Sequence, residues 1–257
     1  MELKNKRIIV TGTGRGIGKA LVEAMSTYDV TIIAVDRHKD RLEELKKGIA
    51  KKARVITYVC DVGSQKAVDT LIDYALKKIG GIDIFIANAG FSYYEKIMRP
   101  DWKHIENIFE TNDFSPIYAA EKMKVVMKGK PYYFLVIDSA VSKLPLPGYS
   151  LYCSTKAALD SFAESYRYEL SKNATFALCY PIATKTDFFN SAGKDVPVPS
   201  PAQTPEQVAK AVIRGIIKNK ESIYPSKTFR AFMVVDRLCP PLARWYQNKE
   251  AKGFKGQ

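Results

Sequence analysis

Continuous apolar runs rich in valine, isoleucine and phenylalanine alternate along this chain with segments of helical periodicity. Such runs are typical of strands buried on both faces of a parallel sheet, and the segments between them are typical of crossover helices. The pattern predicts strands at 7–11, 30–35, 55–59, 84–87, 133–137, 175–180 and 222–224. It predicts helices at 18–27, 39–50, 65–79, 101–127, 150–170 and 205–218.

This rhythm predicts an α/β, Rossmann-like, doubly wound fold of three layers, in which helices flank a mostly parallel seven-stranded sheet. No linker rich in serine, glycine or proline divides the 257 residues, and no internal repeat is visible. We therefore expect a single domain over residues 1–257. Right-handed crossovers place the carboxyl ends of the strands at one edge of the sheet, where ligands bind.

The charge balance is strongly basic, with 40 lysines and arginines against 27 acidic residues and a net charge of +13. The basic residues are scattered, often as doublets such as Lys46-Lys47, and no basic segment is interleaved with aromatic residues. Solvated helix faces explain this distribution better than a nucleic-acid interface. The sequence therefore predicts no nucleic-acid partner, although part of the charge suits anionic ligands.

The cysteines, the start of the chain and its apolar runs together indicate a compartment. The four cysteines contain no CxxC pair, which is typical of free thiols in a reducing cytosol. The first residues lead directly into a strand without a signal peptide, and no apolar run is long enough to span a bilayer. We expect a cytoplasmic protein. The cysteines are Cys60, Cys153, Cys179 and Cys239.

A glycine-rich turn follows the first predicted strand, over Thr11 to Gly18. Glycines at a strand–helix turn allow a sharp bend and bring backbone amides close to an anion at the helix N-terminus. The spacing G-x-G-x-x-G fails here, because it would require a glycine at Ile17; the spacing that fits is Gly12-x3-Gly16-x-Gly18. Tight packing alone could also explain the turn, but its place before a strand that ends in an acid favours a dinucleotide.

That acid is Asp36, at the end of the second predicted strand. A carboxylate in this place accepts hydrogen bonds from the ribose hydroxyls of NAD and repels the additional phosphate of NADP. Arg15 and Arg37 favour the phosphate instead, since a guanidinium suits it. We expect a preference for NAD, with NADP as the alternative.

A tyrosine and a lysine stand four residues apart, at Tyr152 and Lys156, and Ser139 precedes them. That spacing puts the phenol and the ammonium on one helix face. A nearby positive charge favours the phenolate, and this makes tyrosine a proton-transfer group near neutral pH. The other explanation of the pair is an ordinary solvated helix face. No HExxH motif and no cluster of cysteine and histidine is present, so we expect no metal.

Several motifs in one order resemble the short-chain dehydrogenase/reductase family, in its single-domain branch, over all but about the last thirty residues. These motifs are Thr11-Gly12-x3-Gly16-Ile17-Gly18, Asp61-Val62, Asn88-Ala89-Gly90, Asn112, Ser139, Tyr152-x3-Lys156 and Pro181 through Thr186.

The resemblance implies a catalytic group of four residues. Tyr152 would exchange a proton with the substrate oxygen, and Ser139 would orient that oxygen. Lys156 would lower the pKa of Tyr152 and hold the nicotinamide ribose, and Asn112 would shape a helix kink and hold a water of the proton relay. The implied reaction interconverts a secondary alcohol and a ketone with NAD or NADP.

The resemblance also implies a cofactor site. Asp61 and Val62 would border the adenine, Asn88 to Gly90 would line the cofactor, and Pro181 to Thr186 would enclose the nicotinamide. The expected cofactor residues are Gly12, Gly14, Arg15, Gly16, Ile17, Gly18, Asp36, Arg37, Asp61, Val62, Asn88, Ala89, Gly90, Tyr152, Lys156, Pro181, Thr184 and Thr186.

Two positions depart from the family pattern. Ile182 replaces the usual glycine after the sixth strand, which changes the expected pocket beside the nicotinamide. Ser115, followed by Pro116, replaces the usual glycine after Asn112, and a proline there should disturb the helix at 101–127.

Residues 187–204 contain Phe188, Phe189, a glycine and a proline cluster, and we expect them to form a lid over the substrate, with simple packing as the other explanation. Aromatic and aliphatic side chains near the site predict a fairly hydrophobic alcohol or ketone, such as a steroid or another lipid. These flanking residues are Tyr93, Tyr94, Leu144, Pro145 and Tyr149.

The tail at 227–257 is expected to form a C-terminal helical extension with many apolar and basic residues. It could close over the substrate, extend a dimer interface or make weak peripheral contact with a membrane. The resemblance implies a homodimer or homotetramer built on the helices that start near Asp101 and Ser150. The rival function is a non-catalytic dinucleotide sensor, since a fold does not determine a function. A sugar epimerase of the longer branch is disfavoured by the glycine spacing and the lack of a large C-terminal domain.

Overall fold

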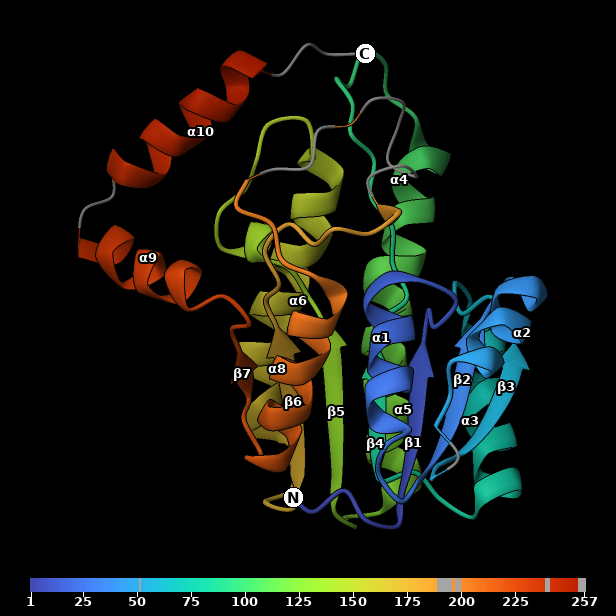
Figure 1. Cartoon of the computed structure of the whole chain (residues 1–257). Coiled ribbons are helices and arrows are strands. Elements are labelled where there is room, and N and C mark those ends of the chain that lie inside the picture. Colours follow the sequence, from blue (N-terminus) through green and yellow to red (C-terminus); the bar gives the residue numbers. More distant parts are fainter. Residues whose placement is uncertain (51, 189–195, 197–199, 239–240, 254–257) are drawn as a thin grey trace.

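The computed structural model describes residues 1–50, 52–188, 196, 200–238 and 241–253. Its sheet has seven parallel strands in the order β3-β2-β1-β4-β5-β6-β7 (Figure 1). This arrangement confirms the predicted doubly wound α/β fold. The strands are β1 (Lys6–Thr11), β2 (Val30–Asp36), β3 (Arg54–Val59), β4 (Ile84–Ala87), β5 (Tyr132–Ile137), β6 (Ala174–Cys179) and β7 (Ser222–Ile223).

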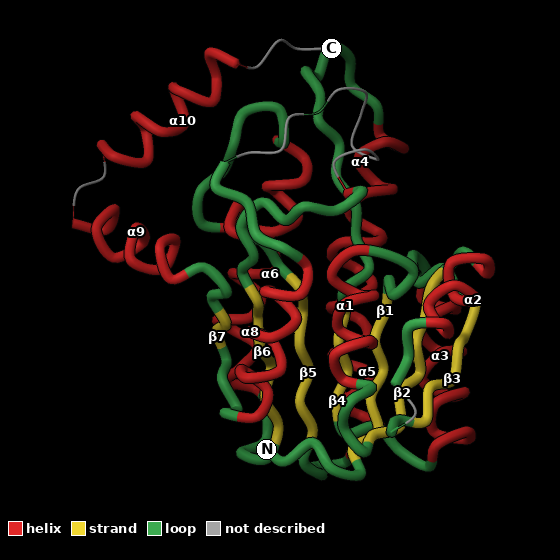
Figure 2. Tube along the Cα trace, in the orientation of Figure 1, coloured by secondary structure: helices red, strands yellow, loops and turns green. Residues whose placement is uncertain are grey.

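Helices cover both faces of the sheet, as Figure 2 shows. On one face, α1 (Gly16–Met25), α2 (Lys39–Lys47) and α8 (Pro205–Ile217) share a core with residues such as Ile8 and Ile32. On the other face, α3 (Gln65–Ile79), α5 (Ser115–Met127) and α6 (Ser150–Tyr166) pack against residues such as Ile9 and Ile33. Successive residues of one strand thus enter different cores, because side chains alternate along a strand. The central strands are buried on both faces, and apolar residues therefore dominate them, whereas the edge strand β3 is partly exposed and carries Arg54 and Thr57.

Local sequence signals determine where several helices begin and end. Ser64 accepts a hydrogen bond from Ala67 N at the start of α3, and Gly80 ends that helix with a φ of 73°. Thr204 and Gln207 form a reciprocal capping box at the start of α8. Caps of this kind satisfy backbone groups that the helix itself leaves without partners.

The helix predicted at 101–127 is interrupted, as Pro116 leads one to expect. It consists of α4 (Trp102–Phe109), a π-helical turn η1 (Glu110–Phe114) and α5. Pro116 has no N–H to donate to the carbonyl of Asn112, and Ser115 N donates to Glu110 O, five residues back. The widened turn lies at Asn112, where a kink was expected. The helix predicted at 150–170 likewise ends in a 3-10 turn, η3 (Arg167–Glu169).

Two further helices, α9 (Lys227–Leu238) and α10 (Pro241–Gly253), lie beyond the sheet layers, above the carboxyl ends of β6 and β7 (Figure 1). They belong to the tail that was expected to be helical. Most of the expected lid falls outside the described residues, including Phe189. In the described part of the chain, no helix has the length and apolar character needed to cross a bilayer.

Candidate active site

A cavity of about 500 Å³ lies at the carboxyl-end edge of the sheet. It spans the place where β1 pairs with β2 on one side and β4 on the other, the switch point at which doubly wound sheets bind ligands. Most of the residues expected to bind cofactor or substrate line it. These are Gly12, Arg15, Gly16, Ile17, Asp36, Arg37, Asp61, Val62, Asn88, Ala89, Gly90, Ser139, Tyr152, Lys156, Pro181, Thr184 and Thr186.

The glycine turn is held to β4 by a compact set of hydrogen bonds. Thr11 Oγ1 accepts from the backbone N–H groups of Asn88 and Ala89, each at 3.0 Å. The Asn88 amide donates to Thr11 O and Gly12 O, each at 2.9 Å. Gly18 is packed against this turn, because a Cβ there would lie 2.0 Å from Gly12 O. Gly18 therefore shapes the turn from behind without lining the cavity.

The Asp36 carboxylate is buried and accepts two backbone hydrogen bonds. Gly14 N donates to Oδ2 at 2.8 Å, and His38 N donates to Oδ1 at 3.0 Å. A Cβ on Gly14 would come within 2.8 Å of Oδ2, so Gly14 is required for this approach. Asp36 thus ties the end of β2 to the glycine turn while it also lines the cavity.

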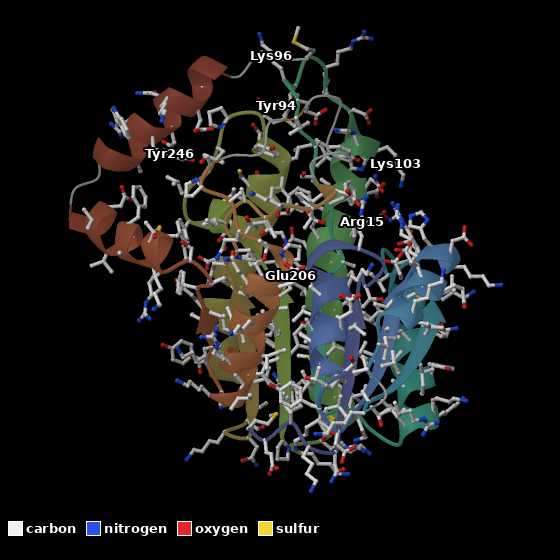
Figure 3. All side chains as sticks on the ribbon, in the orientation of Figure 1. Arg15, Tyr94, Lys96, Lys103, Glu206 and Tyr246 are labelled. Atoms are coloured by element: carbon white, nitrogen blue, oxygen red, sulfur yellow. The ribbon has the colours of Figure 1, made fainter. Side chains whose placement is uncertain are left out.

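Arginines surround the same corner of the cavity. Arg15, Arg37 and Arg41 all line it, and Arg37 pairs with Asp61 at 3.5 Å. Burial lowers the pKa of Arg15, and the positive charge of Arg41 lowers it further. Figure 3 places Arg15 beside the glycine turn, below Tyr94 and Tyr246 at the same end of the molecule. This corner combines the carboxylates of Asp36 and Asp61 with a cluster of cations.

Tyr152 and Ser139 meet across the cavity from two elements. Ser139 follows β5, and its Oγ also accepts from Val141 N at 3.3 Å. Tyr152 lies in the first turn of α6. Burial raises the pKa of the Tyr152 phenol, and a hydrogen bond with Ser139 opposes that shift. Burial thus favours the protonated phenol, and the hydrogen bond with Ser139 favours the phenolate.

Lys156 lies one helical turn further along α6 and is only 4% exposed. Its Nζ donates to Ile137 O at 3.1 Å and lies 5.8 Å from the centre of the Tyr152 ring. Burial lowers the pKa of Lys156, whereas Asp138 and Asp113 raise it. The spacing predicted from the sequence thus puts both groups on the face of α6 that faces the cavity, not on a solvated face.

Asn112 does not line the cavity; it is buried beneath it in the π-helical turn. Its Oδ1 accepts from Phe91 N at 3.1 Å, and its Nδ2 donates to Phe91 O at 2.9 Å. The same Nδ2 donates to Thr155 Oγ1 at 3.2 Å. Asn112 thus connects the loop after β4 to the helix that carries Tyr152 and Lys156.

The rest of the cavity wall is apolar. Leu144 and Tyr149 line it as expected, and Phe188 packs against Tyr152 with ring centres 5.6 Å apart. The residues Phe229, Phe232 and Tyr246 of α9 and α10 also line it. Three expected flanking residues lie outside the lining: Tyr93 stacks on His104, Tyr94 packs on Tyr149, and Pro145 O accepts from Gln247.

Sequence reasoning missed several lining residues. Val35, Cys60 and Ile137 stand next to expected positions at strand ends and could have been found from that spacing. Arg41, one turn into α2, had no motif to indicate it. Asp138 and Asp113 were also missed, although each is adjacent to a residue of the expected catalytic group. Among the described residues, no group of three or more histidine, cysteine, aspartate or glutamate side chains is arranged to hold a metal.

Comparison with known proteins places this geometry in a family. The model of the short chain dehydrogenase family matches residues 6–197. A hydroxysteroid 11-beta-dehydrogenase 1-like protein of Gallus gallus is 28% identical over 87% of this chain and 80% of its own length. A 3-ketodihydrosphingosine reductase of Dictyostelium discoideum is 27% identical over 94% of this chain and 79% of its own.

Two solved structures show the same fold. One is a short-chain dehydrogenase/reductase from Burkholderia phymatum in complex with NAD, with a TM-score of 0.82 at 18% identity, covering 94% of this chain and 96% of that one. Another is a short-chain dehydrogenase from Sphingobium yanoikuyae in complex with NADPH, with a TM-score of 0.79 at 22% identity, covering 92% and 94%. The chain belongs to the short-chain dehydrogenase/reductase family and is an oxidoreductase that uses a nicotinamide dinucleotide.

Proposed function

We propose that this enzyme interconverts a secondary alcohol and a ketone, with Tyr152 as the acid–base group. The observation that carries this proposal is the meeting of Ser139, Tyr152 and Lys156 in one cavity with the glycine turn. When bound, the nicotinamide dinucleotide supplies or accepts the hydride. The side chains then need to hold the substrate oxygen and to exchange one proton with it.

Each polar side chain has a separate role in this proposal. In ketone reduction, the Tyr152 phenol donates its proton to the substrate oxygen, and in alcohol oxidation the phenolate accepts that proton. Ser139 Oγ, already bonded to Tyr152, orients the same oxygen. The Lys156 ammonium stabilises the phenolate and holds the nicotinamide ribose. Asn112 fixes the position of Thr155 and hence of Lys156 beside it, and is the residue proposed to hold a water of the proton relay.

The cofactor residues fit a dinucleotide. Gly12 and Gly16 have φ values of 67° and 55°, which only glycine adopts at low cost, and the turn they form leads into the N-terminus of α1. That N-terminus has no acidic residue in its first turn, so it suits the negative charge of a pyrophosphate. We propose that this turn holds the pyrophosphate, that Asp61 and Val62 border the adenine, and that Pro181, Thr184 and Thr186 enclose the nicotinamide.

We propose NAD as the preferred cofactor, because the Asp36 carboxylate is fixed at the corner where the adenosine ribose would lie. Three arginines around this corner favour NADP instead, namely Arg15, Arg37 and Arg41. Comparing kcat/KM for the two cofactors in the wild type and in Asp36→Ala tests this. A wild type that turns over faster with NADP would overturn the preference.

We propose a fairly hydrophobic substrate. The wall around Tyr152 is built from aromatic and aliphatic side chains, notably Phe188, Phe229 and Phe232. The printed names of two relatives, a hydroxysteroid dehydrogenase-like protein and a 3-ketodihydrosphingosine reductase, agree with such a ligand. A panel of sterols, long-chain ketones and sugar alcohols checks this. A clear preference for the sugars would refute it.

A Tyr152→Phe variant separates the enzyme from a dinucleotide sensor. The variant loses the phenol oxygen but keeps the ring, so we expect it to bind cofactor normally and to lose turnover. Measuring cofactor binding by fluorescence and turnover by absorbance distinguishes the two functions. A wild type that binds the dinucleotide but is inert across a broad carbonyl and alcohol panel would favour the sensor.

We propose that α9 and α10 close the substrate end of the cavity, because Phe229, Phe232 and Tyr246 face it. A weak membrane contact is the second proposal for this region, since Val234 and Trp245 are more than 60% exposed. Replacing both by serine, together with flotation on vesicles that contain phosphatidylserine, tests the membrane contact. Unchanged flotation would refute the membrane contact.

We propose a homodimer or homotetramer that uses the outer faces of the helices starting near Asp101 and Ser150. Apolar side chains are exposed there, including Trp102 at 81%, Val125 at 69% and Tyr168 at 93%. Light scattering of the wild type and of Trp102→Glu tests the proposal. A monomeric wild type at micromolar concentration would overturn it.

A further inference from the structure

Two aspartates, Asp138 in the cavity wall and Asp113 behind it, have carboxylates without hydrogen-bond partners among the described residues. Asp113 is 2% exposed and Asp138 is 3% exposed. Neither oxygen of either carboxylate has a hydrogen-bond partner among the described residues. The Ser142 hydroxyl lies near Asp138, but it donates to Ser139 O at 2.7 Å. Buried carboxylates without donors are costly, so their presence requires a reason other than hydrogen bonding.

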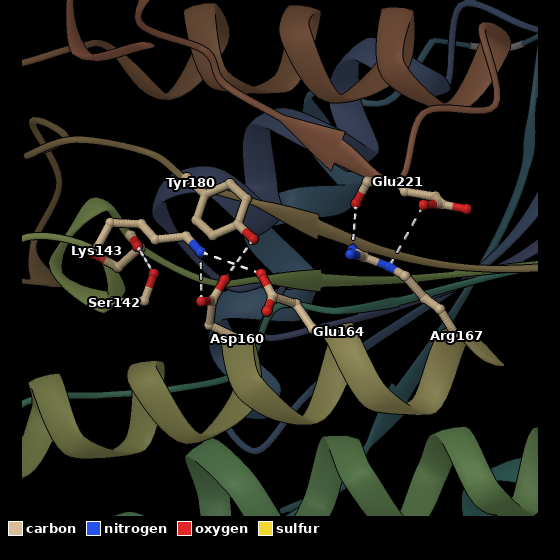
Figure 4. A network of polar contacts seen from close by, with 8 residues as sticks. Ser142, Lys143, Asp160, Glu164, Arg167, Tyr180 and Glu221 are labelled. Atoms are coloured by element: carbon tan, nitrogen blue, oxygen red, sulfur yellow. Dashed lines mark hydrogen bonds and ion pairs between the residues drawn. The ribbon is translucent and has the colours of Figure 1, made fainter. Parts of the chain in front are cut away.

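A nearby acid shows how such a group is normally satisfied. Asp160, on α6, binds Lys143 Nζ at 2.6 Å and accepts from the Tyr180 hydroxyl at 2.7 Å (Figure 4). Both of its carboxylate oxygens are occupied. Asp113 and Asp138 have no equivalent contacts, although all three acids are near one another in the fold. Asp160 is thus satisfied by its own hydrogen bonds, whereas Asp113 and Asp138 are not, and this difference indicates a different role for these two acids.

Both unpartnered acids are adjacent to the groups that position Lys156. Asp138 directly follows Ile137, whose carbonyl oxygen accepts from Lys156 Nζ at 3.1 Å. Asp113 directly follows Asn112, which reaches Thr155 next to Lys156. The lysine is thus approached by one acid from the end of β5 and by another from the π-helical turn.

The buried Lys156 ammonium is also poorly solvated. It is 4% exposed and donates one protein hydrogen bond, so a buried ammonium there lacks solvation. Burial lowers its pKa, and among the described residues it is Asp138 and Asp113 that raise it. Without them, the amine would lose its proton more readily and its effect on Tyr152 would be lost.

The surroundings of the two carboxyl groups oppose their ionisation. Burial raises the pKa of Asp113 to about 7 and that of Asp138 to about 8, and the negative charge of Asp113 adds to the second shift. The positive charge of Lys156 lowers the pKa of both acids, and their negative charges raise the pKa of Lys156, so the charged forms of the three groups favour one another. Asp138 also interacts electrostatically with Asp160, Tyr152, Cys179 and Tyr180.

We propose that Asp113 and Asp138 are positioning residues for the proposed reaction, which together supply the buried negative charge that keeps Lys156 an ammonium beside Tyr152. The inference rests on the proposed function, because its purpose is to stabilise the Tyr152 phenolate. It adds two residues to the expected catalytic group, and these act through Lys156.

The test uses Asp113→Asn, Asp138→Asn and the double variant, with Asp83→Asn as a matched control. Asp83 is a partly buried acid that binds Arg7 at 2.9 Å, near the amino end of β4 and away from the cavity. In the double variant, we expect the pH at which alcohol oxidation reaches half its maximal rate to rise by about one unit or more. Each single variant should show a smaller rise, and the control none.

A second readout does not depend on turnover. An amine reacts with acetic anhydride only when neutral, so mass spectrometry can follow the acetylation of Lys156 against pH. We expect Lys156 to react at lower pH in the double variant than in the wild type. An unchanged acetylation profile in a folded double or single variant would overturn the inference. So would a fall in the oxidation midpoint, because it would mean that the acids act directly on Tyr152.

The two possible failures can be told apart. If the wild type turned over no alcohol or ketone, the proposed function would fail, while the acetylation profile would still test the charge on Lys156. If the wild type were active and the acids had no effect on either readout, the inference alone would fail. Thermal unfolding of each variant shows whether the site remains folded.

Discussion

The two halves of the cavity are built by different means. The cofactor half is a backbone structure, in which a glycine turn is held to β4 by Thr11 and Asn88 and to β2 by Asp36. The substrate half is a wall of side chains from distant segments, including Phe188, Phe229 and Tyr246. Backbone contacts require particular residues, whereas an apolar wall requires only size and hydrophobicity. Substitutions should therefore be costly in the first half and should alter selectivity in the second.

The largest effect is expected at the boundary between the halves, where Tyr152→Phe removes the proton-transfer group. We expect kcat to fall about 10²- to 10⁴-fold, the usual contribution of general acid–base catalysis. Cofactor affinity should stay within about threefold of the wild-type value. A variant that retained most of its kcat would remove Tyr152 from the mechanism.

The next effect concerns the cofactor half. A Gly18→Ala substitution would place a Cβ 2.0 Å from Gly12 O, a backbone atom that cannot move aside cheaply. We expect a loss of cofactor affinity of at least about tenfold and a lower melting temperature, because overpacking costs about 1–3 kcal/mol. Normal affinity in a titration would mean that the turn is less rigid than its hydrogen bonds indicate.

A milder change is expected in the substrate half. Phe232→Ala removes an aromatic side chain from the wall but leaves the cofactor corner intact. We expect kcat/KM for a hydrophobic substrate to fall about tenfold, on the scale of 1–3 kcal/mol for a lost apolar group, with an unchanged cofactor Kd. Equal losses for apolar and polar substrates would contradict a selective wall.

The smallest expected effect is a pH dependence of the free energy of unfolding, which arises from the buried carboxyl group of Asp113. Burial raises the pKa of Asp113 to about 7, above its value in an unfolded chain. The stability linked to this group is therefore full below the unfolded pKa and is lost as the pH rises through about 7. Relative to the wild type, Asp113→Asn should gain stability as the pH rises from about 4 to about 7 and then keep a constant difference, as measured by urea unfolding. A constant difference across that range would mean that Asp113 does not titrate there.

The cofactor half was also the easier half to predict from the sequence. Its glycines, Asp36 and Asn88 have fixed spacings because they bond to one another through the backbone. The wall was predicted only in kind: Leu144 and Tyr149 line it, whereas Tyr93 and Tyr94 turn to other partners. Spacing along the chain cannot indicate which aromatic side chain of a neighbouring pair will reach a cavity.

Pro116 and the two buried acids also show what the sequence alone can and cannot predict. Pro116 correctly indicated a disturbed helix, because its missing N–H is a local property of the backbone. The form of that disturbance, a π-helical turn, depends on packing against α6 and could not be predicted. Asp113 and Asp138 appear ordinary in the sequence, since burial and the proximity of Lys156 arise only from the folded chain.

The order of the segments along the chain has a consequence for biosynthesis. The four strands β1 to β4, with the glycine turn and Asp36, lie within the first 90 residues, whereas α9 and α10 come last. Because chains fold from the N-terminus during synthesis, a nascent chain exposes the strands of the nucleotide cleft well before it can enclose a substrate. Until α9 and α10 leave the ribosome, Phe229, Phe232 and Tyr246 cannot complete the apolar wall of the cavity.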